Sequence, residues 1–525
     1  MQAWPAFSDD AMNVRRVGRV FVLASIAVLC SAHIGSPDAW YNGPAGPYHV
    51  LVHVQAPPVV PGIAIISIQP QEKVETISAF VNKYDAVAGG PPPDIARPVS
   101  NNPGWYRTHL WVMDPGSNSV TVSLHGAQGV GTVVVPLVAV AARRLEFNGP
   151  LTVALGAAGL ILVAGLLTVV GAAVRESVLP PGVEADDARR KRARFAMLRG
   201  AVVIVLVLAA FGAWWRAEDS VFAQNLFKPL TVAARTRFTD GVGNQLVLTI
   251  TDARWAERNN ARRLRFRGGN EFTTLIDDHQ KLMHLFVIAE NGQSNFAHLH
   301  PTTTDSASFT SVLPALPAGR YRVFADVLHA TGLTETLSTT VLIEASGARP
   351  EVRLTDVDDA WIAGAALDAA STAKLADGST LTWIGASAPH VVGEEASLRF
   401  TLTPPAGDTA ALQPYLEMLG HAAVVRDDGA VFIHLHPMGT ISTAAQTMLS
   451  RSRGDAHDMP LPGTSRTEMP GMAMTGNTAA GDTLHFPYAF PMPGNYTVWV
   501  QVKRHGRVLT GAFRVRVAAA GQGKS

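Results

Sequence analysis

Most of the chain alternates between short apolar and polar runs, broken by Pro and Gly, and only three stretches are continuously apolar. Residues 48–54 alternate along their length, and residues 63–68 form a second run of the same kind. A period of two with turn residues between runs is typical of β-strands. The pattern therefore predicts a mainly β protein built from β-sandwich domains, with transmembrane α-helices at the apolar stretches.

The first apolar stretch, residues 20–32, follows three arginines and is short for a membrane span. Polar, glycine-containing sequence comes after it, as expected for a signal peptide within residues 1–33. An uncleaved N-terminal membrane anchor is the alternative. Lipid attachment at Cys30 is less favoured because Leu29, before it, is not a small residue.

The other two apolar stretches predict transmembrane helices at residues 151–174 and 200–215, with Trp214 and Trp215 at a membrane interface. The connection between them, residues 175–199, is rich in arginine and predicts a basic cytoplasmic loop. We interpret its charge as a solvated linker or a contact with membrane lipid. The two-helix hairpin then places residues 34–147 and 216–525 on the extracytoplasmic, periplasmic side of the cell membrane.

The composition limits which partners and which kinds of metal or disulfide site the chain can have. Apolar residues make up 47% of the 525 residues and charged residues 16%, and the formal net charge is +1. This balance gives no reason to expect nucleic acid as a partner. Cys30 is the only cysteine, so a disulfide framework, a thiolate metal site and a blue-copper site are all excluded outside the first apolar stretch.

The second half of the chain contains a repeated motif. Residues 284–301 and 421–437 each start with His, pass through a Gly-containing turn and end in His-Leu-His-Pro. A Gly-x-Tyr-x-Val strand follows each copy, at residues 319–323 and 494–498. We therefore predict duplicated domains at residues 216–346 and 350–520, and a third domain at 34–147 that resembles them only faintly.

Each copy of the motif predicts a β-hairpin with three histidines on one face. In the second copy the Asp428-Gly429 turn places His421 opposite His436. A three-residue loop at 291–293 restores the same register in the first copy. The six candidate ligands are His284, His298, His300, His421, His434 and His436. Three convergent imidazoles suit Cu(II), Zn(II) or Ni(II), whereas the alternative is that the rings satisfy backbone carbonyls at strand ends.

Three further groups of residues are weaker candidates. Residues 277–279 precede the first hairpin and could add a ligand, although an ordinary polar turn is the favoured interpretation. His329 and His505 follow the Gly-x-Tyr-x-Val strands at unknown distances from the hairpins.

A methionine-rich loop predicted at residues 438–492 points to copper. It holds seven of the thirteen methionines, and soft thioether sulfur selects Cu(I). The candidate ligands in it are Met438, His457, Met459, Met469, Met472 and Met474. The alternative is a disordered linker in which methionine has no role.

The repeated segments resemble the YtkA-like group of bacterial envelope domains. The resemblance is carried by His284 with His298-Leu-His300-Pro301, by the strand entry Pro317-Ala-Gly319-Arg-Tyr321, and by their second-copy counterparts. It covers residues 216–346 well, 380–515 less well and 34–147 faintly, and the methionine-rich loop departs from it. The resemblance implies immunoglobulin-like or cupredoxin-like β-sandwiches in the cell envelope, from a group often encoded near copper and cytochrome-oxidase genes.

Together these features predict a membrane-anchored extracytoplasmic protein that binds copper for resistance, sequestration or delivery to a cuproenzyme or another envelope protein. The alternative is a non-metal envelope scaffold built from immunoglobulin-like domains. Neither a nucleophile with a positioned base nor a phosphate-binding or haem-attachment motif is recognisable in the sequence. We therefore expect no enzymatic activity.

Overall fold

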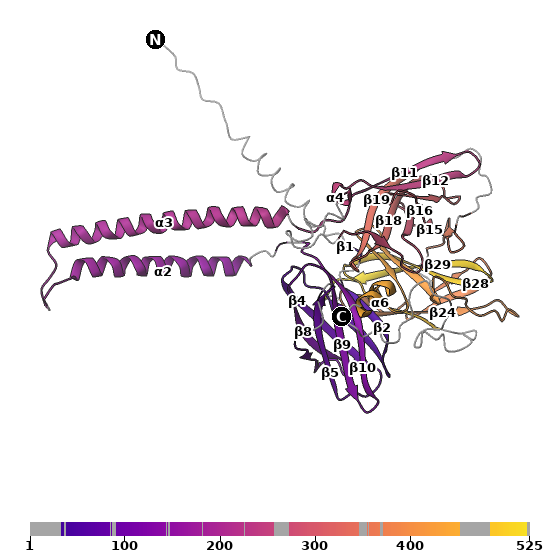
Figure 1. The fold of residues 1–525 in the computed structure, drawn as a ribbon, viewed down its shortest axis with the longest axis horizontal. Coiled ribbons are helices and arrows are strands. Elements are labelled where there is room, and N and C mark those ends of the chain that lie inside the picture. The colour runs from indigo at the N-terminus through magenta and orange to yellow at the C-terminus, as the bar shows by residue number, and fades with distance from the viewer. Residues whose placement is uncertain are drawn as a thin grey trace, which may run out of the picture. The chain divides into compact units, whose positions relative to one another are not determined.

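The computed structural model describes residues 33–35, 38–84, 86, 91–142, 144, 148–180, 182–224, 226–256, 272–345, 354, 356–367, 371–451 and 483–521. These residues form mainly β-strands, arranged in six sheets, together with two long helices (Figure 1). The chain divides into a β unit, Met1–Ala139 with Pro229–Ser525, and a helical unit, Val140–Lys228. The predicted mainly β class with helices is confirmed.

The first two sheets of the β unit enclose one apolar core. Their strand orders are β2-β3-β4-β8-β7 and β10-β9-β5-β6. In β3 the side chains of Val50, Val52 and Val54 are fully buried in this core, as alternation predicts. The strands are β2 (Ala39–Ala45), β3 (Tyr48–Gln55), β4 (Gly62–Pro70), β5 (Thr76–Lys83), β6 (Asp94–Ile95), β7 (Arg97–Pro98), β8 (Tyr106–Val112), β9 (Gly116–Gly126) and β10 (Gly129–Ala139).

The next two sheets contain the first copy of the repeated motif. Their orders are β11-β12-β17-β16 and β13-β18-β14-β15-β20, with β19 paired to β18. Every residue of β14 and β15 is buried, which is expected for strands covered on both faces. The strands are β11 (Val232–Thr239), β12 (Gly243–Ile250), β13 (Leu275–Ile276), β14 (His284–Ala289), β15 (Phe296–Leu299), β16 (Thr302–Thr303), β17 (Ser308–Val312), β18 (Gly319–His329), β19 (Thr334–Ile343) and β20 (Ala360–Ile362).

The last two sheets contain the second copy and share a second apolar core. Their orders are β1-β26-β25-β28-β29-β23 and β21-β22-β24-β27. The short helix α6 (Thr443–Arg451) follows the second hairpin. The strands are β1 (His33–Ile34), β21 (Thr372–Lys374), β22 (Thr380–Ile384), β23 (His390–Val391), β24 (Glu395–Thr403), β25 (Gly420–Arg426), β26 (Val431–Leu435), β27 (Thr483–Ala489), β28 (Gly494–Arg504) and β29 (Arg507–Ala518).

The two copies pack against each other in an approximately symmetric way. We call residues 275–343 the first repeat and residues 412–518 the second repeat. Phe296 of the first stacks on Trp499 of the second, with ring centroids 4.7 Å apart, and Phe324 stacks on Phe432 at 4.3 Å. The motif alignment equates Phe296 with Phe432 and Phe324 with Trp499. The two contacts therefore join the same pair of equivalent positions with the repeats exchanged, as at a twofold interface.

A tyrosine hydrogen bond also occurs once in each repeat. Tyr321 donates its hydroxyl to the carbonyl of Pro317 at 2.7 Å, and Tyr496 donates to the carbonyl of Met492 at 2.7 Å. In both cases the acceptor lies four residues before the tyrosine, at the entry to the central strand. This equivalence supports a common local fold for the two repeats.

The helical unit is a pair of antiparallel helices, α2 (Gly149–Glu176) and α3 (Asp187–Gln224) (Figure 1). Both are long and apolar enough to cross a membrane, and none of the apolar window in either is buried. Leu160 and Ile161, for example, are 74% and 71% exposed. A helix of a soluble protein would bury an apolar face, so these helices are suited to a lipid bilayer.

The connection between the helices is shorter than the predicted basic loop of residues 175–199. Because α2 ends at Glu176 and α3 begins at Asp187, the basic residues from 189 to 199 lie in the first turns of α3. Arginine and lysine are good helix formers, and an acidic residue in the first turn interacts favourably with the helix dipole. The second apolar helix likewise continues beyond the predicted end at residue 215.

Candidate metal centre

Seven buried histidines from the two repeats form one continuous group, which we call the histidine cluster. Neighbouring ring centroids lie between 4.6 and 6.2 Å apart, and no member is more than 7% exposed. The members are His279, His284, His298, His300, His421, His434 and His436. Six of the seven are the candidate ligands predicted from the two hairpins.

The predicted hairpin registers are confirmed. Leu285 pairs with Leu299 in the first hairpin, so His284 lies opposite His300. Ala422 pairs with Leu435 in the second, which places His421 opposite His436. The sequence did not indicate that the two histidine faces meet, but the hairpins lie on facing sheets and share the interface around Phe286 and Phe432, whose ring centroids are 5.1 Å apart.

The first triad consists of His284, His298 and His300, whose ligand atoms all lie within 4.8 Å of one another. His284 Nδ1 is 3.3 Å from His298 Nε2. The opposite nitrogen of each ring has a hydrogen-bond acceptor. His284 Nε2 lies 3.2 Å from the carbonyl oxygen of Asp278, and His298 Nδ1 lies 2.9 Å from Gln501 Oε1. His300 Nδ1 lies 3.0 Å from Asp359 Oδ1. Acceptors at that position fix the tautomer and aim the free nitrogen of metal-binding histidines.

The second triad consists of His279, His421 and His436, again with ligand atoms within 4.8 Å of one another. His436 donates from Nδ1 to the carbonyl of Ile441 at 3.3 Å, and His279 Nδ1 lies 3.4 Å from Glu417 Oε2. The predicted second patch contained His434 in place of His279. The structure therefore brings together the two partners of the hairpin pair, His421 and His436, but adds a third ring from another turn.

The buried ring of His279 shows that the expectation of an ordinary polar turn at residues 277–279 was wrong. The turn is present, with φ of 52° at His279, but the ring is buried inside the cluster. In the second repeat the equivalent residue is Leu416, which has φ of 49° and is 5% exposed. An apolar residue at the equivalent position was the available signal that this side chain points inward.

His434 lies between the two triads. Its ring centroid is 5.3 Å from that of His284 and 5.3 Å from that of His421. Its Nδ1 is 3.5 Å from Asp326 Oδ2. The alignment equates Asp326 with Gln501, so each repeat supplies the polar partner of a histidine in the other.

The electrostatics favour neutral imidazole rings. Burial, and then the neighbouring histidines, lower the pKa of His284, His298, His421 and His434 well below 6.5. Burial is also the main reason that the pKa of His436 falls to about 4. Neutral imidazole is the form that binds a metal ion.

His279 is an exception. Its burial would lower its pKa, but Asp278 and Glu417 outweigh that effect and raise it. The side chain of Asp326 lies beside the cluster and is 23% exposed, and its partial burial raises the pKa of the carboxyl to about 7.

Several cluster nitrogens have no hydrogen-bond partner among the described residues. They are Nε2 of His300, His434 and His436 and both ring nitrogens of His421. A buried polar atom without a partner costs about 1–3 kcal/mol, and native proteins contain few of them. Each neutral ring among them has one lone pair, which a metal ion would accept.

The other candidate residues that the structure describes are not members of the histidine cluster. Met438 is partly buried and packs against the apolar core of the first pair of sheets, and its assignment as a ligand stays a prediction. His329 is bound to Glu335 at 3.0 Å and to the carbonyl of Thr273, outside the cluster. His505 is half exposed and lies 3.0 Å from Asp408. His457, Met459, Met469, Met472 and Met474 fall outside the described residues.

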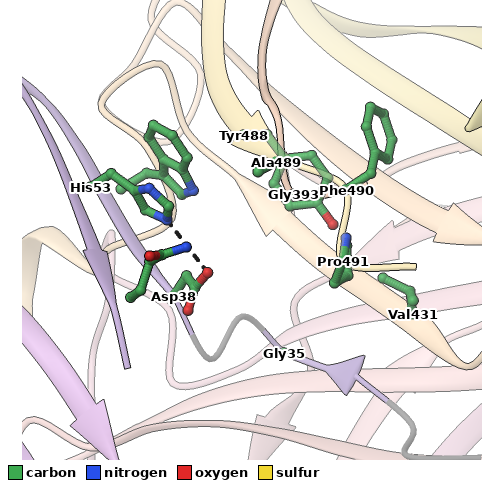
Figure 2. A pocket seen from close by; sticks show the side chains of 11 residues that line it. Gly35, Asp38, His53, Gly393, Val431, Tyr488, Ala489, Phe490 and Pro491 are labelled. Carbon is green, nitrogen blue, oxygen red and sulfur yellow. Dashed lines mark hydrogen bonds and ion pairs between the residues drawn. The ribbon is translucent and has the colours of Figure 1, made fainter. Parts of the chain in front are cut away.

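A separate cavity lies in the β unit, with Asp38 and His53 on one side and Tyr488 and Phe490 on the other (Figure 2). His53 Nε2 is 3.4 Å from Asp38 Oδ2, and the ring of His53 stacks on Trp40 at 3.8 Å. The cavity volume is about 50 Å³. That is room for a few water molecules and far less than an organic ligand needs.

Comparison with known families connects the two repeats. The family described as Domain of unknown function (DUF8832) matches residues 240–345 and 373–519, which contain the two histidine hairpins. No curated protein matches the chain.

Two solved structures illustrate remote similarity. A tetra-tandem repeat of a large adhesion protein has 11% identity, with 87% of this chain and 71% of that chain covered and a TM-score of 0.15. A putative membrane anchored protein from Corynebacterium diphtheriae has 10% identity, with 93% and 98% covered and a TM-score of 0.14. Scores this low establish no common fold. The chain is therefore similar to the DUF8832 family over its two repeats, and the description of that family names no function.

Proposed function

We propose that this chain is a membrane-anchored protein that binds copper in its histidine cluster, for sequestration, resistance or delivery to a cuproenzyme. The observation that carries the proposal is the set of buried imidazole nitrogens without partners among the described residues. In His300 and His436 the other ring nitrogen is held by an acceptor, Asp359 Oδ1 and the carbonyl of Ile441 respectively. This arrangement is expensive for a network of histidines alone. It is what a preformed metal site requires.

Copper is the metal that the chain's chemistry favours. Imidazole ligands suit copper, zinc and nickel equally, but thioether sulfur selects Cu(I). The methionine-rich sequence begins directly after the second hairpin, with Met459, Met469, Met472 and Met474 in it. Its role in the proposal rests on the sequence, as does the resemblance to YtkA-like envelope domains.

The proposal also places the cluster outside the cytoplasm. The arginines that follow the first helix favour a cytoplasmic connection, which puts the β unit on the periplasmic side. We further propose that the β unit consists of three immunoglobulin-like sandwiches, each made by one pair of sheets. The tyrosine hydrogen bond of Tyr321 and Tyr496 supports this for the repeats, since such a tyrosine is common in that fold.

Metal titration of the full-length protein in detergent tests the proposed function. Copper should bind stoichiometrically to the purified protein. The combined variant His298→Ala, His300→Ala, His434→Ala and His436→Ala should lose this binding. A matched control removes His109 and His125, which are exposed, and should bind as the unaltered protein does.

The scaffold alternative predicts a different outcome. If the histidines serve only packing, the purified protein binds no copper above the level of the exposed-histidine control. That result would reject the copper proposal and leave the non-metal interaction module as the better account of the chain.

A further inference from the structure

The histidine cluster has more ligands than one ion can use. A tetrahedral ion takes four nitrogen ligands, whereas seven imidazole rings lie in contact here. The rings divide into two triads that share no member. His434 is the seventh ring, with a buried Nε2 that has no partner among the described residues.

Each triad has its own supporting groups. The first is held by Asp278, Gln501 and Asp359 through the nitrogens that face away from its centre. In the second triad, Ile441 holds His436 and Glu417 holds His279. Separate support for two sets of rings is expected when each set has to keep a fixed aim.

Carboxylates surround the histidine cluster, which favours the binding of cations there. Four carboxylates have an oxygen within 4 Å of a cluster nitrogen. They are Asp278 (3.8 Å), Glu417 (3.4 Å), Asp359 (3.0 Å) and Asp326 (3.5 Å). Two further carboxylates nearby, Asp356 and Asp358, are instead paired with Lys281 and Lys503. The side chain of Asp359 is fully buried and that of Asp278 is 15% exposed, and buried charge is costly unless it is balanced, as a bound cation would do.

We propose that the histidine cluster is a two-ion site. One ion is bound by His284, His298 and His300, and the other by His279, His421 and His436. His434, between the triads, supplies the additional ligand to one of them. The inference rests on the proposed metal binding and adds the number of ions, their ligands and their proximity.

The two ions are not equivalent, because the repeats differ at one ligand. His279 occupies the position of Leu416, with nearly the same φ. The second ion therefore depends on a residue that only the first repeat contributes. The substitution His279→Leu copies a side chain that the other repeat already accommodates at this backbone conformation, so it removes one ligand with little strain.

The test is copper stoichiometry in the full-length protein, with Cu(II) as the probe because this ion prefers imidazole to thioether. The unaltered protein should retain two Cu(II) ions per chain after desalting, and His279→Leu should retain one. His300→Gln, in the other triad, should also retain one and serves as the second variant if His279→Leu fails to fold. Circular dichroism of the metal-free proteins checks the fold.

Electron paramagnetic resonance adds a reading that stoichiometry alone cannot give. Rings of the two triads approach within 6.2 Å of each other, so two Cu(II) ions should couple magnetically. The unaltered protein should give a broadened spectrum of reduced intensity, and each variant the sharp spectrum of an isolated ion. One ion in the unaltered protein, two in His279→Leu, or two uncoupled ions would each overturn the two-ion site. No bound ion would overturn the proposed function as well.

Discussion

The buried carboxylate of Asp359 should control metal affinity at the first triad without being a ligand of that triad. Its Oδ1 accepts hydrogen bonds from Nδ1 of His300 at 3.0 Å and from the backbone N–H of His300 at 2.8 Å. The side chain is fully buried. The carboxylate therefore fixes both the position of His300 and the proton on the nitrogen that faces away from the triad.

The substitution Asp359→Asn keeps the size of the side chain and one acceptor oxygen but removes the charge. Outer partners of metal-binding histidines typically contribute 10–100-fold in metal affinity. We expect a loss of that size in the Kd of the first ion, or about 1.4–2.7 kcal/mol. Fold stability in the absence of metal should change less, since the hydrogen-bond geometry is retained.

The assay is a competition titration of Cu(II) against a chelator of known affinity, with Asp358→Asn as the matched control. Asp358 is the preceding carboxylate and pairs with Lys503 at 2.8 Å. A Kd for Asp359→Asn that equals that of the unaltered protein would refute the role of Asp359. An equal loss of affinity in Asp359→Asn and Asp358→Asn would also refute it, because the loss would then come from the removal of any nearby negative charge.

Three other outcomes can be checked in the metal-free protein. Trp499→Ala removes a fully buried ring from the interface between the repeats and should cost about 3–5 kcal/mol in denaturant unfolding; a loss below that of a surface substitution would contradict the packing. Tyr496→Phe deletes one hydrogen bond to the carbonyl of Met492 and should cost about 1 kcal/mol. The melting temperature should fall as the pH drops below 6.5, with the raised pKa values of His279 and Asp326 opposing part of that fall. Unfolding lets rings with lowered pKa values take up protons, at up to about 1.4 kcal/mol per pH unit for each ring, and a melting temperature independent of pH would contradict the burial of His284, His298, His421 and His434.

The hairpins were predictable because their geometry is local. The Asp428-Gly429 turn and the period of two along each strand determine which side chains face each other. The register then follows by counting outward from the turn, and the structure has His421 opposite His436 as predicted. The same applies to strand β3 and to the two apolar helices, which depend on runs of a few consecutive residues.

The packing of the two histidine faces against each other, which forms one cluster, was not predictable from local sequence. It depends on the stacking of Phe296 on Trp499 and of Phe324 on Phe432, residues that look like ordinary core positions in the sequence. The place of His279 in the cluster was not predictable for a related reason, because this residue lies in a turn with positive φ, outside any strand period. Long-range packing and turn conformation thus decided the composition of the cluster.

The basic segment, residues 175–199, is a local stretch whose secondary structure was nevertheless predicted wrongly. The arginine content predicts a loop, but charge and helix propensity are independent properties, and the arginines and lysine of residues 189–199 are good helix formers. Their place at the start of α3 leaves the expected orientation rule unaffected, because that rule counts charge near the ends of a span and not its secondary structure.

The covalent link between the two repeats has a consequence for how the histidine cluster can evolve and assemble. In a homodimer each half must carry identical residues, so Asp326 and Gln501 could not differ and neither could His279 and Leu416. A single chain removes that constraint and lets one half specialise while the other keeps its role. It also makes assembly of the cluster unimolecular, with a high effective concentration of each half for the other. The cluster can therefore form in a protein that is present at only a few copies per cell.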